Sequence, residues 1–173
     1  MALENRRPVC DFRCTLLAAV VGKKHVLWVK VGDGALVIEK MPAGGSAQLH
    51  ALGLVGKGEY ANQTTFIDEK VCAEDVQYGL EDGQCVSALF AMSDGAAERF
   101  VSSNGSKVAQ RLANWAQELR DGKLSRQQLT VAFYGDDFRK GHSGDDCSLA
   151  MLAAGVVSDV ESAKVPARNR LPD

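Results

Sequence analysis

The residues in this sequence that are best suited to chemistry are carboxylates next to apolar segments. Asp94 follows the apolar residues 87–92, and Asp145 and Asp146 stand directly before the apolar residues 147–152. If these segments are neighbouring strands, their ends bring the carboxylates together. Mg²⁺ and Mn²⁺ prefer such oxygen ligands, and bound ions of this kind activate water and stabilise phosphoryl transition states. The pattern fits a cation site, but Asp-Gly and Asp-Asp are also common turn sequences.

Several other reaction classes lack the residues that they need. The sequence has no His-Glu-x-x-His zinc helix, no phosphate-cradling Gly-x-x-x-x-Gly-Lys-Ser/Thr loop and no dinucleotide Gly-x-Gly-x-x-Gly motif after a strand. No cysteine is followed by an arginine six residues later, which excludes the loop of cysteine-dependent phosphatases. Carboxylate chemistry is therefore the main candidate.

Composition narrows the class of protein further. The chain has 173 residues, a length typical of one domain, and its 20 Lys and Arg against 22 Asp and Glu give a net charge of −2. Nucleic-acid-binding proteins usually carry a basic surplus, and no apolar run approaches the length of about 20 residues that spans a membrane. Five scattered cysteines suit a reducing compartment. We expect a cytoplasmic protein with neither nucleic-acid nor membrane partners.

The apolar patterning predicts the elements that must position the carboxylates. Residues 15–21 and 26–31 are expected to be antiparallel strands, and Gly32-Asp33-Gly34 is expected to close a second hairpin onto residues 35–38. Further strands are expected over residues 48–52, 64–67, 72–76, 87–92 and 147–152.

Two helices are expected between the last two strands. Residues 105–120 have apolar side chains at helical spacing, and Gly122 stands where a helix C-cap would be. Ser125 and Gln128 have the spacing of a capping box, and Gly135 ends that second helix. Strands followed by helices and a final strand indicate an α+β domain with antiparallel sheet.

Five ordered segments resemble the metal-dependent protein phosphatases of type 2C, most closely a bacterial branch. They are residues 11–21, 31–35, 58–66, 91–95 and 144–149. The resemblance implies an α-β-β-α sandwich of antiparallel sheets, and it implies hydrolysis of phosphoserine and phosphothreonine in a phosphorylated protein substrate. Two Mg²⁺ or Mn²⁺ ions are expected in a complete domain of this family.

The same resemblance assigns roles to single residues. Asp94 and Asp145 correspond to catalytic, metal-binding aspartates, while Gly95 and Asp146 belong to the implied metal site. Asp33 corresponds to a turn that we interpret as structural.

The chain also departs from the family pattern near its start. No Asp-Gly segment precedes Asp11, so at most about half of the family's metal ligands are present. We expect residues 9–155 to form a C-terminal portion of the domain, incomplete at the N-terminus, with residues 1–8 and 156–173 as flexible tails. Little activity and self-association through an uncovered sheet edge or apolar face are then expected. The alternative is a catalytically incomplete regulatory or binding module of the same fold.

Overall fold

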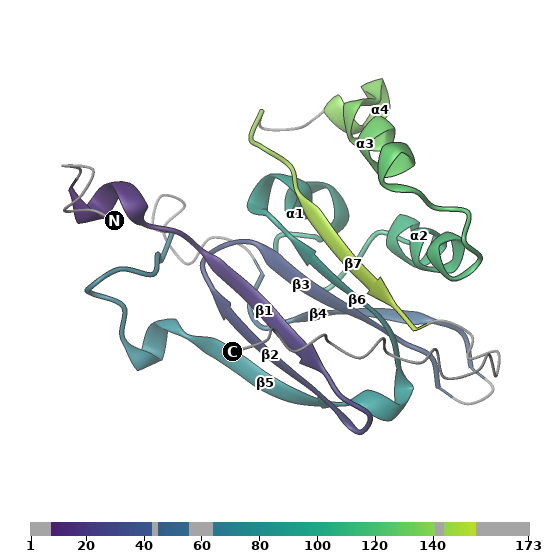
Figure 1. The fold of residues 1–173 in the computed structure, drawn as a ribbon, viewed down its shortest axis with the longest axis horizontal. Helices are drawn as coiled ribbons and strands as arrows, with labels where there is room; N and C mark the ends of the chain where they lie inside the picture. The colour runs from purple at the N-terminus through teal and green to yellow at the C-terminus, as the bar shows by residue number, and fades with distance from the viewer. Residues whose placement is uncertain (1–7, 43–44, 56–63, 141–143, 155–173) are drawn as a thin grey trace, which may run out of the picture.

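The computed structural model describes residues 8–42, 45–55, 64–140 and 144–154, which form two antiparallel sheets and a group of helices (Figure 1). The smaller sheet has the order β1-β2-β5, and the larger has the order β4-β3-β6-β7. The strands are β1 (Leu16–Val21), β2 (His25–Val31), β3 (Ala35–Lys40), β4 (Gln48–Leu52), β5 (Gln77–Asp82), β6 (Val86–Met92) and β7 (Leu149–Ala153). The helices are α1 (Asp94–Phe100), α2 (Arg111–Arg120), α3 (Arg126–Tyr134) and α4 (Asp136–Arg139), and 3-10 turns span Val9–Phe12, Ala73–Asp75 and Gly83–Cys85.

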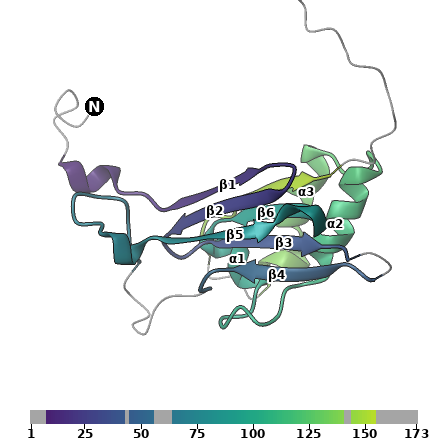
Figure 2. The ribbon, with the colours of Figure 1, turned by 90° about the horizontal axis from the view of Figure 1, so that it is seen from below.

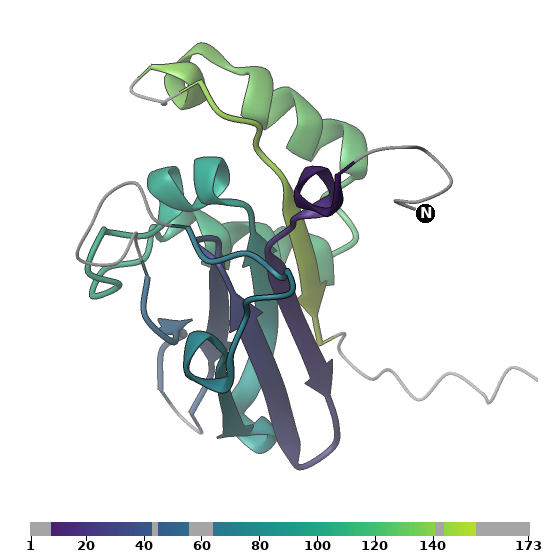
Figure 3. The same cartoon turned by 90° about the vertical axis from the view of Figure 1, so that its left-hand side faces the viewer.

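Strand β3 shows how the layers pack, because it is buried on both faces. Leu36 and Ile38 point toward the smaller sheet and pack with Trp28. Val37 points the other way, into a core that includes Phe100 of α1 and Trp115 of α2. The sheets therefore stack on each other, and the helices lie on one side of the stack (Figures 2 and 3). The expected α+β class with two antiparallel sheets is confirmed.

The expected second hairpin is wrong. Strand β2 pairs with β1 and β5, whereas β3 pairs with β4 and β6, so residues 32–34 carry the chain from one sheet to the other. Gly32 has φ +103°, and a Cβ on Gly34 would lie 2.5 Å from the carbonyl oxygen of Met92. Glycine is needed here because neighbouring segments approach the backbone closely. The Asp-Gly signal for a two-residue turn does not distinguish this role from that of a hairpin turn.

Three other expectations are corrected. Residues 72–76 contain a 3-10 turn rather than a strand, because the Asp75 carboxylate accepts the Cys72 backbone N–H at 3.0 Å. The strand of this region is β5. Residues 64–67 contribute an isolated bridge between Ile67 and Cys14, and helix α2 begins at Arg111, six residues later than expected.

The end of α2 and the start of α3 follow the sequence signals. Gly122 adopts φ +69° just after α2. The Ser125 hydroxyl accepts the Gln128 N–H at 3.3 Å, and the Gln128 side chain accepts the Ser125 N–H at 2.7 Å. The predicted capping box is thus confirmed.

The outer face of the smaller sheet is apolar and exposed. Val20, Leu27 and Leu80 lie side by side across β1, β2 and β5, and their exposed fractions are 68%, 52% and 62%. Tyr78, on the same face, is 74% exposed. We refer to these four side chains as the outer apolar face.

Of the tails expected at residues 1–8 and 156–173, all residues except Pro8 lie outside the described residues. Within the part of the chain that the structure describes, no helix is long and apolar enough to cross a membrane.

Candidate functional site

The predicted carboxylates meet where β6 ends and β7 begins. These strands are antiparallel neighbours with Met92 opposite Leu149, so Asp94, in the first turn of α1, lies beside the segment that leads into β7. Ser93 joins the two segments: its hydroxyl donates to the Asp146 carbonyl at 3.1 Å and accepts the Ser148 N–H at 3.0 Å. The structure therefore brings Asp94 together with Asp145 and Asp146.

Gly95 has a steric role at this junction. It is buried, and a Cβ added to it would lie 2.9 Å from the carbonyl oxygen of Asp146 and 3.1 Å from Cβ of Asp145. Real Cβ atoms essentially never approach backbone this closely. The absence of a side chain at Gly95 thus lets the segment before β7 lie against the start of α1.

The pKa of the neighbouring Cys147 thiol is affected by the negative charges of this site. Burial, and then the negative charges of Asp146, Asp94, Glu98 and Asp145, raise the pKa of Cys147. Because these charges act on one sulfur, the four carboxylates share one region. A thiol with a raised pKa is a weak nucleophile, so Cys147 is poorly suited to nucleophilic attack.

Asp33 and Glu98 are neighbours of Asp94 that sequence reasoning did not place here. A cavity of about 300 Å³ is lined by Asp33, Asp94 and Glu98 together with apolar side chains. The Thr64 hydroxyl donates to the Asp33 carboxylate at 2.6 Å. Glu98 stands four residues after Asp94 and so shares a helix face with it. A prediction of helix α1 from the sequence would therefore have placed Glu98 beside Asp94.

The donor set suits a divalent cation in kind but is incomplete. Carboxylate oxygens are the ligands that Mg²⁺ and Mn²⁺ prefer. Among the described residues, however, no group of three or more His, Cys, Asp or Glu is arranged to hold a metal ion. Among the described residues, the carboxylates gathered here therefore do not make up a complete cation site.

Strand β2 carries a buried lysine close to Asp33. Lys30 is fully buried, and its ammonium donates to the Leu54 carbonyl oxygen at 2.6 Å. Burial lowers its pKa, and the nearby negative charge of Asp33 opposes part of that effect. The folded protein therefore releases this proton at lower pH than the unfolded chain, whose lysine titrates near 10.5.

This difference predicts a pH dependence of stability. A depressed pKa contributes stability that is fully present above 10.5 and is lost as the pH falls through the folded-state pKa of Lys30. Between the folded-state pKa of Lys30 and pH 10.5, the free energy of unfolding should therefore rise with pH. Lys30→Met should flatten this rise, as measured by urea unfolding at a series of pH values in that range. The matched control Lys107→Met removes an exposed ammonium and should keep the rise. An equally steep rise in Lys30→Met would contradict the assignment.

Comparison with known protein families gives a match over most of the chain. A family model described as protein phosphatase 2C matches residues 1–133. The matched range covers more than half of the 173 residues and contains Asp94 and Gly95, while Asp145 and Asp146 lie beyond it. Neither the curated proteins nor the solved structures gave a significant match.

Proposed function

The chain belongs to the protein phosphatase 2C family, and on this premise we propose that it serves metal-dependent hydrolysis of phosphoserine and phosphothreonine in proteins. The family generally uses Mg²⁺ or Mn²⁺. The single observation that carries the proposal is the meeting of Asp94 with Asp145 and Asp146 at the adjacent ends of β6 and β7.

In this proposal the chain's residues provide a negatively charged, pre-arranged surface. Asp94 and Asp145 supply the carboxylates, and Asp146 adds a third charge at its exposed edge. Ser93 and Gly95 act as positioning residues, since the hydroxyl ties the segments together and the glycine permits their contact. A bound divalent cation would supply an activated water and stabilise charge on the phosphoryl group.

A second candidate function rests on the incomplete donor set. Site strength for hard cations rises with ligand charge and number, and the described residues offer no group of three suitable ligands. A module of this fold that binds a phosphorylated segment without hydrolysing it is consistent with that observation. Low activity of the isolated chain is expected in either case.

The test measures Mn²⁺ binding by calorimetry and hydrolysis of an aryl phosphate with Mn²⁺, with and without chelator. Asp94→Asn should weaken Mn²⁺ binding by about tenfold or more, or about 1.4 kcal/mol, because it removes one charged ligand. Any turnover should be abolished by chelator and by this substitution. Asp121→Asn, which removes an exposed carboxylate at the far end of α2, is the matched control.

The outcomes separate the candidate functions. Turnover that depends on both chelatable metal and Asp94 supports the phosphatase. Phosphopeptide binding without turnover supports the binding module. Mn²⁺ binding that is equal in Asp94→Asn and the unmodified chain would show that these aspartates are turn residues only.

A further inference from the structure

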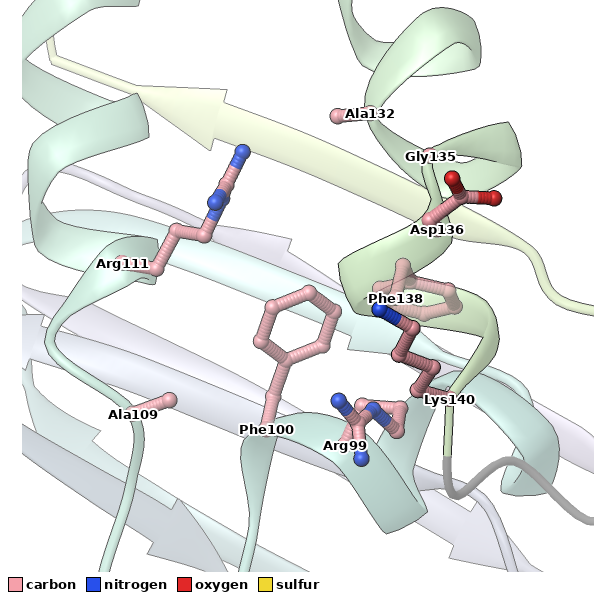
Figure 4. A pocket seen from close by; sticks show the side chains of 9 residues that line it. All are labelled: Arg99, Phe100, Ala109, Arg111, Ala132, Gly135, Asp136, Phe138 and Lys140. Carbon is pink, nitrogen blue, oxygen red and sulfur yellow. The ribbon is translucent and has the colours of Figure 1, made fainter.

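A second cavity lies among the helices, away from the carboxylates just described. Its volume is about 590 Å³, and Figure 4 shows it between the end of α1, the start of α2 and the segment from α3 through α4. Among the residues that the structure describes, Arg99, Arg111 and Lys140 bring three positive charges to its lining, against the carboxylate of Asp136. This surplus occurs in a chain whose net charge is −2, so the cavity, which we call the basic pocket, is a local concentration of positive charge.

Aromatic rings orient the two guanidinium groups of the basic pocket. The Arg99 guanidinium carbon lies 5.8 Å from the centroid of the Phe138 ring, and that of Arg111 lies 5.0 Å from the Trp115 ring. Both distances are within the range of cation–π contact. A guanidinium held by its face keeps its N–H groups directed outward in the plane, which is the geometry that binds phosphate or carboxylate through two hydrogen bonds.

The floor of the basic pocket is apolar and firmly packed. Phe100 is 4% exposed, and its ring contacts those of Trp115 and Phe138 at centroid distances of 5.3 and 5.7 Å. In Figure 4 Phe100 stands between Arg111 on one side and Phe138 and Lys140 on the other. An apolar floor with a few convergent charged groups, in a volume of several hundred Å³, is typical of a site for a small organic ligand.

The basic pocket is separate from the carboxylate site. Asp145 and Asp146 line a different cavity, to which Phe138 also contributes. Along α1, Asp94 and Arg99 are five residues apart, or about 7.5 Å along the helix axis. An anion bound by Arg99 therefore does not have to share space with the carboxylates.

We propose that the basic pocket binds a phosphomonoester group through Arg99, Arg111 and Lys140, with the organic part of the ligand against Phe100 and Phe138. A phosphate dianion matches the charge and the two-pronged donors. The phosphomonoester belongs either to a phosphorylated side chain or to a free organic phosphate. Binding requires neither a metal ion nor Asp94, so the proposal goes beyond the hydrolytic function and stands independently of it.

The experiment measures binding of phenyl phosphate, and of a phosphoserine peptide, by calorimetry in the presence of chelator. Arg111→Gln combined with Lys140→Gln should weaken binding by about tenfold or more, because two charged donors are lost. Both side chains are exposed, which limits effects on folding. Arg126→Gln, at an exposed arginine outside the pocket, is the control for loss of a positive charge elsewhere on the surface.

A gain in affinity provides a readout that misfolding does not produce. Asp136→Asn should strengthen binding severalfold, since it removes a carboxylate that opposes the bound anion, while Asp94→Asn should leave it unchanged. Tighter binding of the peptide than of phenyl phosphate identifies a protein ligand, and the reverse identifies a free organic phosphate. No binding, or equal loss in Arg126→Gln and the double variant, overturns the proposal.

Discussion

Arg120→Met is expected to lower the free energy of unfolding by about 3–5 kcal/mol, because it leaves the carboxylate of Glu39 buried without its counter-charge. The Arg120 guanidinium is ion-paired with Glu39, and the two side chains are only 8% and 1% exposed. The Ser87 hydroxyl donates to the same Glu39 carboxylate at 2.6 Å. This arrangement ties the end of α2 to β3 and β6, so its loss should loosen the helices from the larger sheet.

A nearby exposed pair provides the control for Arg120→Met. Lys123 and Asp121 form an ion pair at 3.0 Å with side chains 73% and 36% exposed, and such surface pairs contribute at most about 1 kcal/mol. Urea unfolding of Arg120→Met and Lys123→Met should therefore differ by several kcal/mol. Adding Glu39→Met to Arg120→Met should recover much of the loss, because the unpaired charge is then removed. Equal destabilisation by the two single variants would contradict this account.

Leu27→Glu is expected to suppress self-association of the chain. Leu27 stands at the centre of the outer apolar face, between Val20 of β1 and Leu80 of β5. Exposed contiguous apolar surfaces of this kind mark interaction sites. We propose a second copy as the occupant, since the outer apolar face is uncharged and can pack against itself about a twofold axis. The glutamate would then bring like charges together in the interface, a cost of several kcal/mol.

Sedimentation velocity over a range of concentrations checks this prediction. The unmodified chain should show a concentration-dependent rise in mass that Leu27→Glu weakens by about a hundredfold or more, or about 2.8 kcal/mol. Val131→Glu, at a side chain of α3 that is 65% exposed, makes the same change on another face and should associate normally. A monomeric unmodified chain, or association retained in Leu27→Glu, would rule out this interface.

Some features of the fold follow from residues that are close in sequence. The apolar runs predict β1, β2, β6 and β7 with small errors at their ends, since a strand buried against a core must be continuously or alternately apolar. Likewise, the Ser125 cap depends only on groups within one helical turn. Such local signals need no knowledge of distant partners.

The errors occur where local sequence is ambiguous. Glycines at 32 and 34 signal a tight turn, but the choice between a hairpin and a crossing to the second sheet depends on Thr15 and Met92, which contact them from other segments. Strand β5 lies at a sheet edge and alternates half-buried and exposed positions, and its half-buried residues are Gln77, Gly79 and Glu81. It therefore has a weak apolar signal. Helix α1 has only seven residues, too few for a clear helical period.

The carboxylate site could be predicted from local sequence, whereas the basic pocket could not. Asp94 and Asp145 were predictable as a pair because each adjoins a strong apolar segment, and antiparallel pairing places those ends together. The grouping of Arg99, Arg111 and Lys140 was not predictable. These three residues come from separate segments, whose relative positions depend on the packing of Phe100 and Phe138. Local residue patterns predict most of the strands and the strand ends that carry carboxylates. Which distant side chains meet depends on the tertiary packing, because burial of apolar surface, rather than any local signal, sets how helices and sheets dock.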